Sequence, residues 1–312
     1  MFDFEPAAKP TMYFIGVTTT QSSIMKIFPL WAKELGLGDV VLKGIDLPLH
    51  APAESYRRVV AFIKNDPLST GALVTTHKLD LFSACKDLFD YIDPFAEKLE
   101  EVSSLSKLDG KFRAHAKDPI SSGLALENFV PQSFWKDHGG DVLLLGAGGS
   151  SLAMSLYFSQ EKFAGNVPRS ITIANRSRPR LDSAKRTLAG LSEKIQFHFI
   201  HNPAPADNDK LVAALPPYSL IVNATGLGKD APGSPTTDAV EYPRDSLVWE
   251  INYRGDLIFK EQAQRQADAK NLHMEDGWIY FIHGWTQVVS EVFHVKIEGE
   301  ILDRLSEIAK SV

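Results

Sequence analysis

Short apolar runs alternate with amphipathic stretches along the first part of the chain. Residues 13–17 form an apolar run with Gly16 near its end, which predicts a buried strand, and residues 23–36 then place apolar side chains at helical spacing before a closing glycine. Further strands are predicted at residues 40–45 and 71–75, and further helices at residues 56–65 and 79–88. Strands that alternate with helices predict a mainly parallel sheet covered by helices.

A second alternation of the same kind follows the polar residues 135–140. Its predicted strands are residues 142–145, 170–174, 195–200, 220–223 and 247–251. Two α/β sheets in succession predict two domains with a cleft between them. From Trp278 onward the chain is amphipathic at helical spacing, and we expect these helices to pack back on the first domain.

The composition is that of a soluble globular protein. The chain has 312 residues, of which 44% are hydrophobic and 23% are charged. It contains no apolar run of about 18 residues, the length that a membrane span needs. Its N-terminus lacks the cationic and apolar regions of a secretory signal. We therefore expect a cytoplasmic protein with no membrane partner, present as a monomer or a homodimer.

Charge, cysteine and histidine usage exclude several function classes. The formal net charge of −6 argues against a nucleic-acid partner. The only cysteine, Cys85, rules out an intramolecular disulfide, and its neighbours predict a small buried helical residue rather than a nucleophile. The nine histidines show no H-E-x-x-H spacing, so we expect no metal site, and no G-x-S-x-G motif supports a serine hydrolase.

A glycine-rich turn follows the apolar strand at residues 142–145 and precedes a predicted helix, which is the context of a dinucleotide-binding fingerprint. Gly146 permits the tight turn, and Gly148 lets the backbone approach a pyrophosphate at the start of the helix. The sixth position is Ser151 rather than glycine, and an ordinary structural turn is the alternative. The candidate cofactor-binding residues of this loop are Gly146, Ala147, Gly148, Gly149 and Ser150.

The next strand ends in the sequence Asn-Arg-Ser-Arg-Pro-Arg at residues 175–180. An NAD site usually carries an acidic residue here, which accepts from the ribose 2′-hydroxyl, whereas guanidinium groups suit a 2′-phosphate. The alternative is a solvated basic turn. With the glycine loop, the pattern favours NADP(H) as the cofactor, bound by Asn175, Arg176, Ser177 and Arg180.

The strand at residues 220–223 also runs into small residues. Such residues at the carboxyl end of a strand allow a cofactor ring to lie against the backbone. Asn223, Ala224 and Thr225 are therefore candidate cofactor-binding residues, with an ordinary loop as an equally weighted alternative when this segment is taken alone.

Taken together, these features resemble one family, the shikimate dehydrogenases, which include the quinate and aminoshikimate dehydrogenases. The resemblance extends over nearly the whole chain and depends on the order and spacing of its motifs. These motifs are Ile15-Gly16 with Ser22, residues 71–78, residues 108–111 with Lys117-Asp118, residues 146–151, residues 175–177, residues 223–226 and Asp276-Gly277.

The resemblance implies an α/β protein with a mainly parallel N-terminal substrate-binding and catalytic domain at residues 1–124. A Rossmann-like NADP domain would follow at residues 125–275, and residues 276–312 would be helices that pack back on the first domain. It also implies that Lys78 is the acid/base that exchanges the hydroxyl proton and that Asp118 orients it. A partly desolvated ammonium has a lowered pKa, which a proton carrier near neutral pH needs.

The departures from the family concern the substrate side. The family holds the substrate carboxylate with two serines, and the matching positions here are Ser22 and Ile24. The asparagine before the lysine motif corresponds to Leu73, and the asparagine of a Val-Asn-Thr segment corresponds to Ser103. The lysine motif is one residue shorter, with His77 directly before the lysine.

Two further departures lie near the catalytic aspartate and in the last helices. The family's Asn-Thr-Asp-Gly is here the sequence Ala-Lys-Asp-Pro at residues 116–119, and its C-terminal glutamine falls at Gly284, where His283 or Gln287 would take over. By the same resemblance, the substrate-binding residues are Ser22, Thr75, Ser103, Tyr253 and Gln287.

The sequence therefore predicts an NADP-dependent oxidoreductase that acts on a secondary hydroxyl of a cyclic polyhydroxy acid or a related compound. Removing hydrogen-bond donors from such a site changes its substrate, so shikimate itself is expected to be poor. Quinate or aminoshikimate dehydrogenase activity is an alternative, and so is a non-catalytic ligand sensor with the same fold. The presence of both Lys78 and Asp118 argues against the sensor, which needs no proton carrier.

Overall fold

The computed structural model describes residues 5–163, 165–229 and 231–312. The chain divides into two compact units, the first made of residues 1–117 and 284–312 and the second of residues 118–283. The boundary predicted at residues 124/125 falls inside helix α5 (Asp118–Phe129), which belongs wholly to the second unit. Helix α5 packs there so closely on α7 (Gly149–Phe158) that Gly123 leaves no space for a side chain beside the Tyr157 ring.

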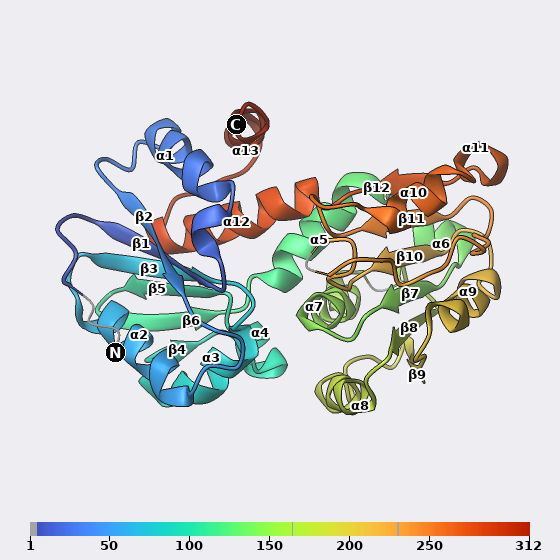
Figure 1. Cartoon of the computed structure of the whole chain (residues 1–312), viewed down its shortest axis with the longest axis horizontal. Helices are drawn as coiled ribbons and strands as arrows, with labels where there is room; N and C mark the ends of the chain where they lie inside the picture. The colour runs from blue at the N-terminus through green and yellow to red at the C-terminus, as the bar shows by residue number, and fades with distance from the viewer. Residues whose placement is uncertain (1–4, 164, 230) are drawn as a thin grey trace. The chain divides into compact units, whose positions relative to one another are not determined.

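The first unit contains a six-stranded sheet in the order β2-β1-β3-β5-β6-β4 (Figure 1). Strands β1 (Thr11–Gly16), β2 (Val41–Asp46) and β3 (Ser69–Val74) are parallel, as the alternating pattern predicts. Strand β5 is antiparallel to both of its neighbours, β3 and β6, and the short edge strand β4 is parallel to β6. The bounds of these three are Tyr91–Ile92 for β4, Ser104–Leu108 for β5 and Lys111–His115 for β6.

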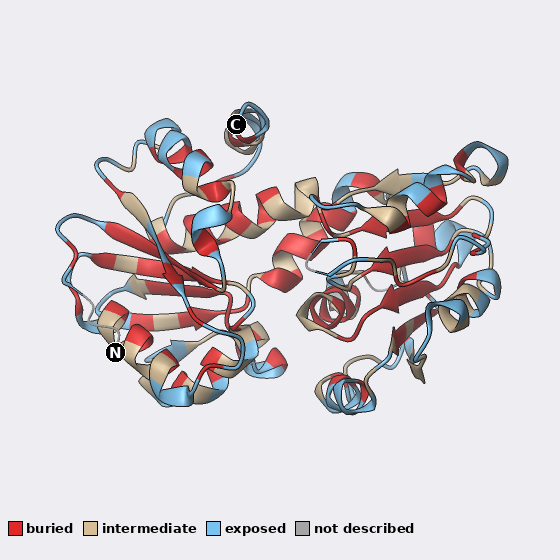
Figure 2. Cartoon of the chain, viewed as in Figure 1, coloured by how far each residue is buried: buried red, intermediate tan, exposed pale blue. Residues whose placement is uncertain are grey.

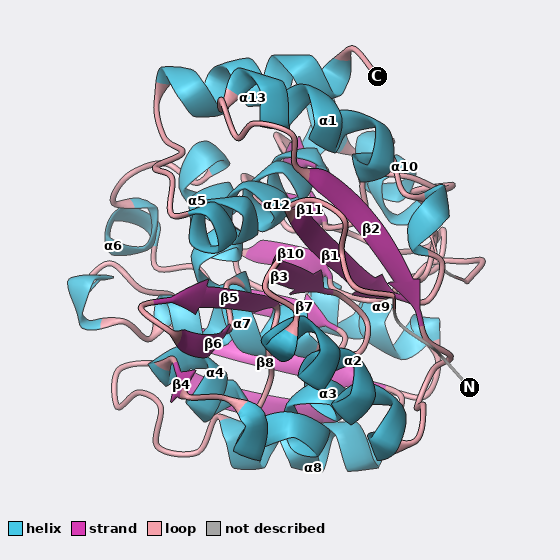
Figure 3. Ribbon diagram, turned by 90° about the vertical axis from the view of Figure 1, so that its left-hand side faces the viewer, coloured by secondary structure: helices cyan, strands magenta, loops and turns pink. Residues whose placement is uncertain are grey.

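Helices cover this sheet and extend to the C-terminus. Residues 284–293 of helix α12 (Trp278–Phe293) belong to the first unit. There the Trp285 ring packs edge-on against the Phe14 ring of β1, with ring centroids 4.9 Å apart. Helices α1 (Ile24–Glu34) and α13 (Glu300–Lys310) lie side by side (Figure 3), where the Trp31 indole Nε1 donates to the Leu305 carbonyl at 2.8 Å. The others are α2 (Ala53–Asn65), α3 (Lys78–Cys85), α4 (Pro94–Leu99) and the 3₁₀ turns η1 (Thr19–Gln21) and η2 (Lys86–Leu88).

Cys85 closes α3 as a buried helical residue, as its sequence context predicts. Burial raises the pKa of its thiol to about 12. The thiolate that a nucleophile needs is therefore disfavoured at neutral pH.

The described residues of the second unit form a six-stranded sheet, all parallel, in the order β12-β11-β10-β7-β8-β9. This is the doubly wound order of the Rossmann fold, in which the chain moves outward in both directions from two central neighbours, here β7 and β10. The bounds are β7 (Val142–Leu145), β8 (Ser170–Asn175), β9 (Gln196–His201), β10 (Leu220–Asn223), β11 (Leu247–Glu250) and β12 (His273–Glu275).

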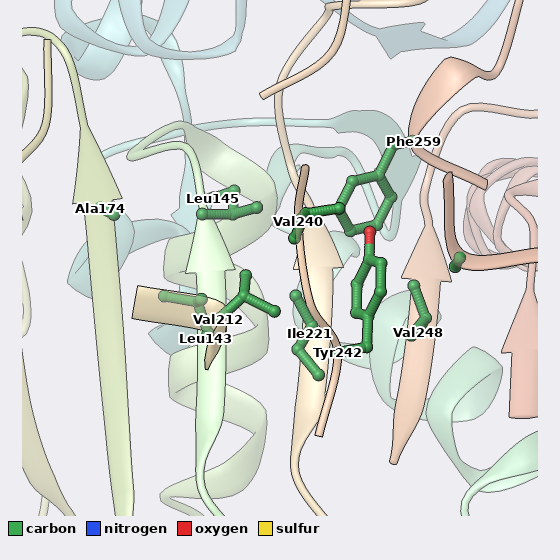
Figure 4. Packing of buried hydrophobic residues seen from close by; sticks show 10 residues of the cluster. Leu143, Leu145, Ala174, Val212, Ile221, Val240, Tyr242, Val248 and Phe259 are labelled. Carbon is green, nitrogen blue, oxygen red and sulfur yellow. The ribbon is translucent and has the colours of Figure 1, made fainter. Parts of the chain in front are cut away.

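The central strands of this sheet are buried on both faces (Figure 2). On one face, Leu143 and Ile221 pack with Tyr242 against Val212 of α9 (Pro205–Ala213) and Phe259 of α10 (Ile258–Gln264) (Figure 4). The remaining helices of the unit are α6 (Phe134–His138), α8 (Arg178–Thr187), α11 (Ala267–Lys270) and the 3₁₀ turn η3 (Glu161–Phe163). Among the described residues, no helix is long and apolar enough to cross a membrane.

Candidate functional site

The second unit carries an open cleft of about 540 Å³ at the carboxyl ends of its strands. Strands β7 and β10 are neighbours, but β8 follows on one side and β11 on the other. Connections that leave in opposite directions open a crevice at this switch point, where doubly wound sheets bind their ligands. Nine of the predicted cofactor-binding residues line the cleft, namely Gly146, Ala147, Gly148, Asn175, Arg176, Ser177, Arg180, Ala224 and Thr225.

The glycine loop turns sharply between β7 and α7. Gly146 has a φ of +120°, and its N–H donates to the Ala174 carbonyl at 2.8 Å. The Ser151 hydroxyl donates to the Gly146 carbonyl at 2.7 Å, so the residue that departs from the strict fingerprint ties the turn together. Gly149 and Ser150 do not line the cleft, but they begin α7, where backbone N–H groups lack intrahelical acceptors and favour an anion.

Replacing Gly146 by alanine is expected to lower the free energy of unfolding by about 2 kcal/mol or more. An alanine Cβ there would lie 2.5 Å from the Ala224 carbonyl oxygen, at a backbone angle that side chains rarely adopt. Urea unfolding and NADPH titration measure the effect. In the control Gly148→Ala, the new Cβ meets no described atom within 4 Å, so stability should stay nearly unchanged while NADPH affinity falls. Equal stability losses in both variants would contradict this account of Gly146.

The segment that leads from the end of β8 into the first turn of α8 places two exposed arginines at the cleft. Arg176 and Arg180 line it, whereas Arg178, also exposed, does not. The Ser177 side chain caps α8 and accepts from the Arg180 N–H at 3.5 Å. No aspartate or glutamate is among the described residues that line the cleft. The arrangement fits a 2′-phosphate better than a 2′-hydroxyl.

One wall of the cleft, formed by residues after β9, was not predicted from the sequence. There the Asn202 amide donates to the Asn208 side chain at 2.9 Å, and Asn208 donates to the Pro235 carbonyl at 2.8 Å. These residues belong to no fingerprint motif. They do follow a predicted strand, and ligands bind at the carboxyl ends of parallel strands, so their position was the available signal. The lining residues that were not predicted are Leu145, Ala174, Asn202, Pro203, Ala204, Pro205, Asn208, Gly226, Leu227, Ala231 and Pro235.

Asn223 does not line the cleft and is fully buried. Its amide donates to Glu250 Oε2 at 2.6 Å, and its Oδ1 accepts from the N–H and the hydroxyl of Thr225 at 3.0 and 2.6 Å. Asn223 therefore shapes the loop whose members Ala224 and Thr225 face the cleft.

In the first unit, three of the predicted residues meet at the carboxyl ends of β1 and β3. The Thr75 N–H donates to the Ile15 carbonyl, and the Lys78 N–H donates to the Thr75 carbonyl at 3.1 Å. The Val74 N–H donates to the Ser103 carbonyl at 2.9 Å. Thr75, Lys78 and Ser103 are thus brought together through their backbones.

His77 fixes the first turn of α3 just before Lys78. It is buried, its Nε2 lies 3.1 Å from the Leu47 carbonyl, and its Nδ1 lies 3.0 Å from the Tyr56 hydroxyl. A carbonyl oxygen only accepts, so Nε2 carries a hydrogen and donates to Leu47, while the Tyr56 hydroxyl holds the other ring nitrogen. His77, which departs from the family's lysine motif, therefore holds the backbone that carries Lys78 in place.

Ser103 is buried, and its hydroxyl accepts from the Lys117 N–H at 2.7 Å. This hydroxyl holds the chain just before Asp118. Ser22 follows η1 and is half-buried, as is Gln287 on α12. Ile24, at the position of the family's second serine, is a fully buried residue of α1.

Lys117 and Glu291 form an ion pair that the sequence does not predict. The Lys117 ammonium donates to Glu291 Oε2 at 2.6 Å, and Glu291 Oε1 accepts from the Ser106 hydroxyl at 3.3 Å. His115 Nδ1 lies 3.1 Å from Glu291, but burial lowers the His115 pKa to about 4, so its ring is neutral at pH 7. The ion pair therefore joins Glu291 of α12, four residues beyond Gln287, to Lys117, the residue that precedes Asp118.

Asp118 and Tyr253 belong to the second unit. Asp118 is buried as the first residue of α5, and its carbonyl accepts from the Ser122 hydroxyl at 2.7 Å. Tyr253 follows β11, and its ring packs at a tilt against the Phe281 ring, with ring centroids 4.4 Å apart. Because Lys78 lies in the other unit, the pairing of Lys78 with Asp118 stays a prediction. Within the described part of the chain, no cluster of histidine, cysteine, aspartate and glutamate is arranged to hold a metal ion.

No family model matches the chain. A curated shikimate dehydrogenase (NADP(+)) from Methylocella silvestris is 26% identical over 278 residues, which are 89% of this chain and 88% of that protein. Quinate dehydrogenase from Corynebacterium glutamicum, solved in complex with NAD, gives a TM-score of 0.75 at 18% identity over 97% of this chain and 99% of that one. Shikimate 5-dehydrogenase from Thermus thermophilus, solved with NADP(H) and shikimate, gives a TM-score of 0.69 at 18% identity over 96% and 98%.

The solved structures share the α/β fold of this chain, with its two sheets. The curated relative matches along most of its own length, so the similarity is not confined to the Rossmann-like unit. The comparisons therefore agree with what the order of the motifs predicts, since the chain is similar over most of its length to a shikimate dehydrogenase and shares the fold of shikimate and quinate dehydrogenases.

Proposed function

We propose that this protein is an NADP-dependent oxidoreductase of shikimate dehydrogenase type, which interconverts a secondary hydroxyl and a ketone on a cyclic polyhydroxy acid or a related compound. The observation that carries the proposal is the cleft at the β7/β10 switch point, lined by Arg176 and Arg180 and, among its described residues, by no acidic side chain. The Methylocella relative is named as an NADP(+) enzyme, which supports the same cofactor.

The chain's own residues supply binding and proton transfer. Arg176, Arg180 and Ser177 would hold the 2′-phosphate, and the start of α7 would face the pyrophosphate. When bound, NADP supplies or accepts the hydride. Lys78 takes the proton from the substrate hydroxyl during oxidation and returns it during reduction, with Asp118 as its orienting partner.

The substrate side supports a compound other than shikimate. Ile24 is in the core, where the family has a carboxylate-binding serine, and the Ser103 hydroxyl is engaged with the backbone of Lys117. Ser22, Thr75, Gln287 and Tyr253 remain as the candidate substrate ligands. Fewer donors to the ring hydroxyls and the carboxylate should weaken shikimate selectively. Quinate or aminoshikimate oxidation is the nearest alternative within the enzyme class, and the quinate dehydrogenase structure shares the fold.

The test is the absorbance of the nicotinamide with NADP+ or NAD+ and a panel of shikimate, quinate, aminoshikimate and simpler cyclic alcohols. We expect turnover with at least one member, with a kcat/KM for shikimate below that for the best substrate and a preference for NADP+. If NADPH binds but no compound turns over, the non-catalytic sensor becomes the better hypothesis. Absence of NADPH binding would overturn the proposal itself.

A further inference from the structure

A carboxylate is buried directly beneath the cofactor cleft. Glu250 is the last residue of β11, and none of its surface is exposed. Fully buried glutamates are rare in proteins unless their oxygens are satisfied. Neither the glycine fingerprint nor the proposed chemistry uses this residue.

Both oxygens of Glu250 are occupied by N–H donors. Strands β10 and β11 pair so that Asn223 lies beside Glu250, and the Asn223 amide donates to Oε2 at 2.6 Å. Oε1 accepts from the Asn252 backbone N–H at 2.9 Å and from the Asn252 side-chain amide at 2.7 Å. A carboxylate suits this environment because it accepts at both oxygens and presents no hydrogen.

Asn223 and Asn252 connect Glu250 to the residues that line the cleft. With its NH₂ directed at Glu250, Asn223 presents Oδ1 to the N–H and hydroxyl of Thr225. The Asn252 amide also donates to the carbonyls of Thr225 and Leu227, at 3.2 and 3.3 Å. The Thr225 hydroxyl in turn accepts from the Leu227 N–H. Residues 224–227 line the cleft, so their conformation decides the shape of its wall.

We infer that Glu250 is a positioning residue of the cofactor site, which holds residues 224–227 in their binding conformation through Asn223 and Asn252 without touching the cofactor. The inference rests on the proposed function, since it assumes that this cleft binds NADP(H). Glu250→Gln tests it closely, because the amide keeps the shape but places an NH₂ group against N–H donors.

The ionisation of Glu250 provides a second readout. Burial raises the pKa of Glu250 to about 7. The nearby Asp276 carboxylate also raises this pKa, whereas the hydrogen bonds from Asn252 and Asn223 lower it. Asp276 is itself paired with Lys260 at 2.8 Å. Protonation puts a hydrogen on an oxygen that faces N–H donors, so NADPH affinity should fall as the pH drops through about 7.

This acid effect on binding is opposite in sign to the effect of Glu250 on stability. The pKa in the folded protein lies above its ordinary value of 4.5, so the contribution of Glu250 to folding is largest below pH 4.5 and is lost as the pH rises through about 7. Glu250 therefore favours the folded state at the pH where the loop loses its binding conformation. A residue with only a structural role would not weaken NADPH binding in that direction.

The experiment measures the Kd of NADPH by nicotinamide fluorescence between pH 5.5 and 8.5, with urea unfolding alongside. Glu250→Gln should raise Kd about tenfold at pH 8 and remove the wild-type pH dependence near 7, as expected for a site that loses a charge-assisted hydrogen bond. The matched control is Glu275→Gln, the same exchange at the end of the neighbouring β12, which should leave Kd within about twofold.

Each outcome bears on the inference. If wild type binds NADPH and Glu250→Gln has the same Kd and pH profile, the inference is overturned while the proposed function stands. If wild type binds no NADPH, both fail. Should Glu250→Gln not fold, Asn252→Ala takes its place, because it removes the tie to Thr225 and Leu227, and a wild-type Kd for that variant overturns the inference.

Discussion

Exchange of Lys78 for methionine is expected to lower kcat about 10³-fold in either direction while leaving the Kd of NADPH within about threefold. Methionine keeps an apolar stem of similar length but removes the ammonium that exchanges the substrate proton. Steady-state kinetics with the best substrate of the panel and fluorescence titration with NADPH measure the two quantities. The control is Lys86→Met, an exposed lysine of the following 3₁₀ turn, which should keep wild-type kcat.

The fold should survive this exchange because the backbone around Lys78 is held by other groups. Its N–H donates to Thr75 and its carbonyl accepts from the Val102 N–H at 3.2 Å. The buried His77 ring is fixed between Leu47 and Tyr56. If Lys78→Met retained more than about a tenth of wild-type kcat, the lysine would not be the proton carrier. A parallel loss of NADPH affinity would instead indicate damage to the fold.

The central strands of the second unit, β7, β10 and β11, were predictable because each is an apolar run that is buried on both faces of a parallel sheet, whereas the edge strand β12 is short and polar and was not predicted. Val142–Leu145 matches its prediction residue for residue, and all four side chains are buried. By contrast, β5 and β6 were not predicted, since lysine and arginine interrupt their apolar patterns. The hairpin was still marked in the sequence by Asp109-Gly110, whose positive φ angles of 51° and 72° suit the turn between twisted antiparallel strands.

Some residues of the candidate site were likewise predictable from the sequence, and others were not. Residues whose backbone approaches the cleft, such as Gly146, could be found because a tight turn at a positive φ restricts the residue type. The supporting residues could not, because Glu250 reaches Asn223 through the pairing of β10 with β11, which the local sequence does not specify. Ser103 was assigned to the substrate by resemblance, but its hydroxyl accepts from the backbone N–H of Lys117, a contact that becomes visible only in the folded chain.

Replacing Arg176 by alanine is expected to raise the Kd of NADPH about 10- to 100-fold and to change the Kd of NADH by no more than about twofold. The guanidinium lines the cleft beside Asn175 and Ser177, where it would donate to a 2′-phosphate that NADH lacks. Because the interaction is ionic and exposed, the difference between the two cofactors should shrink as salt rises. Parallel fluorescence titrations with both nucleotides at low and high salt give the measurement.

The other arginines at residues 175–180, called the basic loop, provide the controls for Arg176→Ala. Arg180 also lines the cleft, so Arg180→Ala should again affect NADPH more than NADH, whereas Arg178→Ala removes an equal charge from an exposed residue that does not line it. A general electrostatic attraction would make the three variants alike, because each lowers the net charge by the same amount. A specific 2′-phosphate site separates Arg178 from the other two. Equal losses for NADPH and NADH in Arg176→Ala would assign the loop to the shared part of the dinucleotide and remove the structural basis for NADP selectivity.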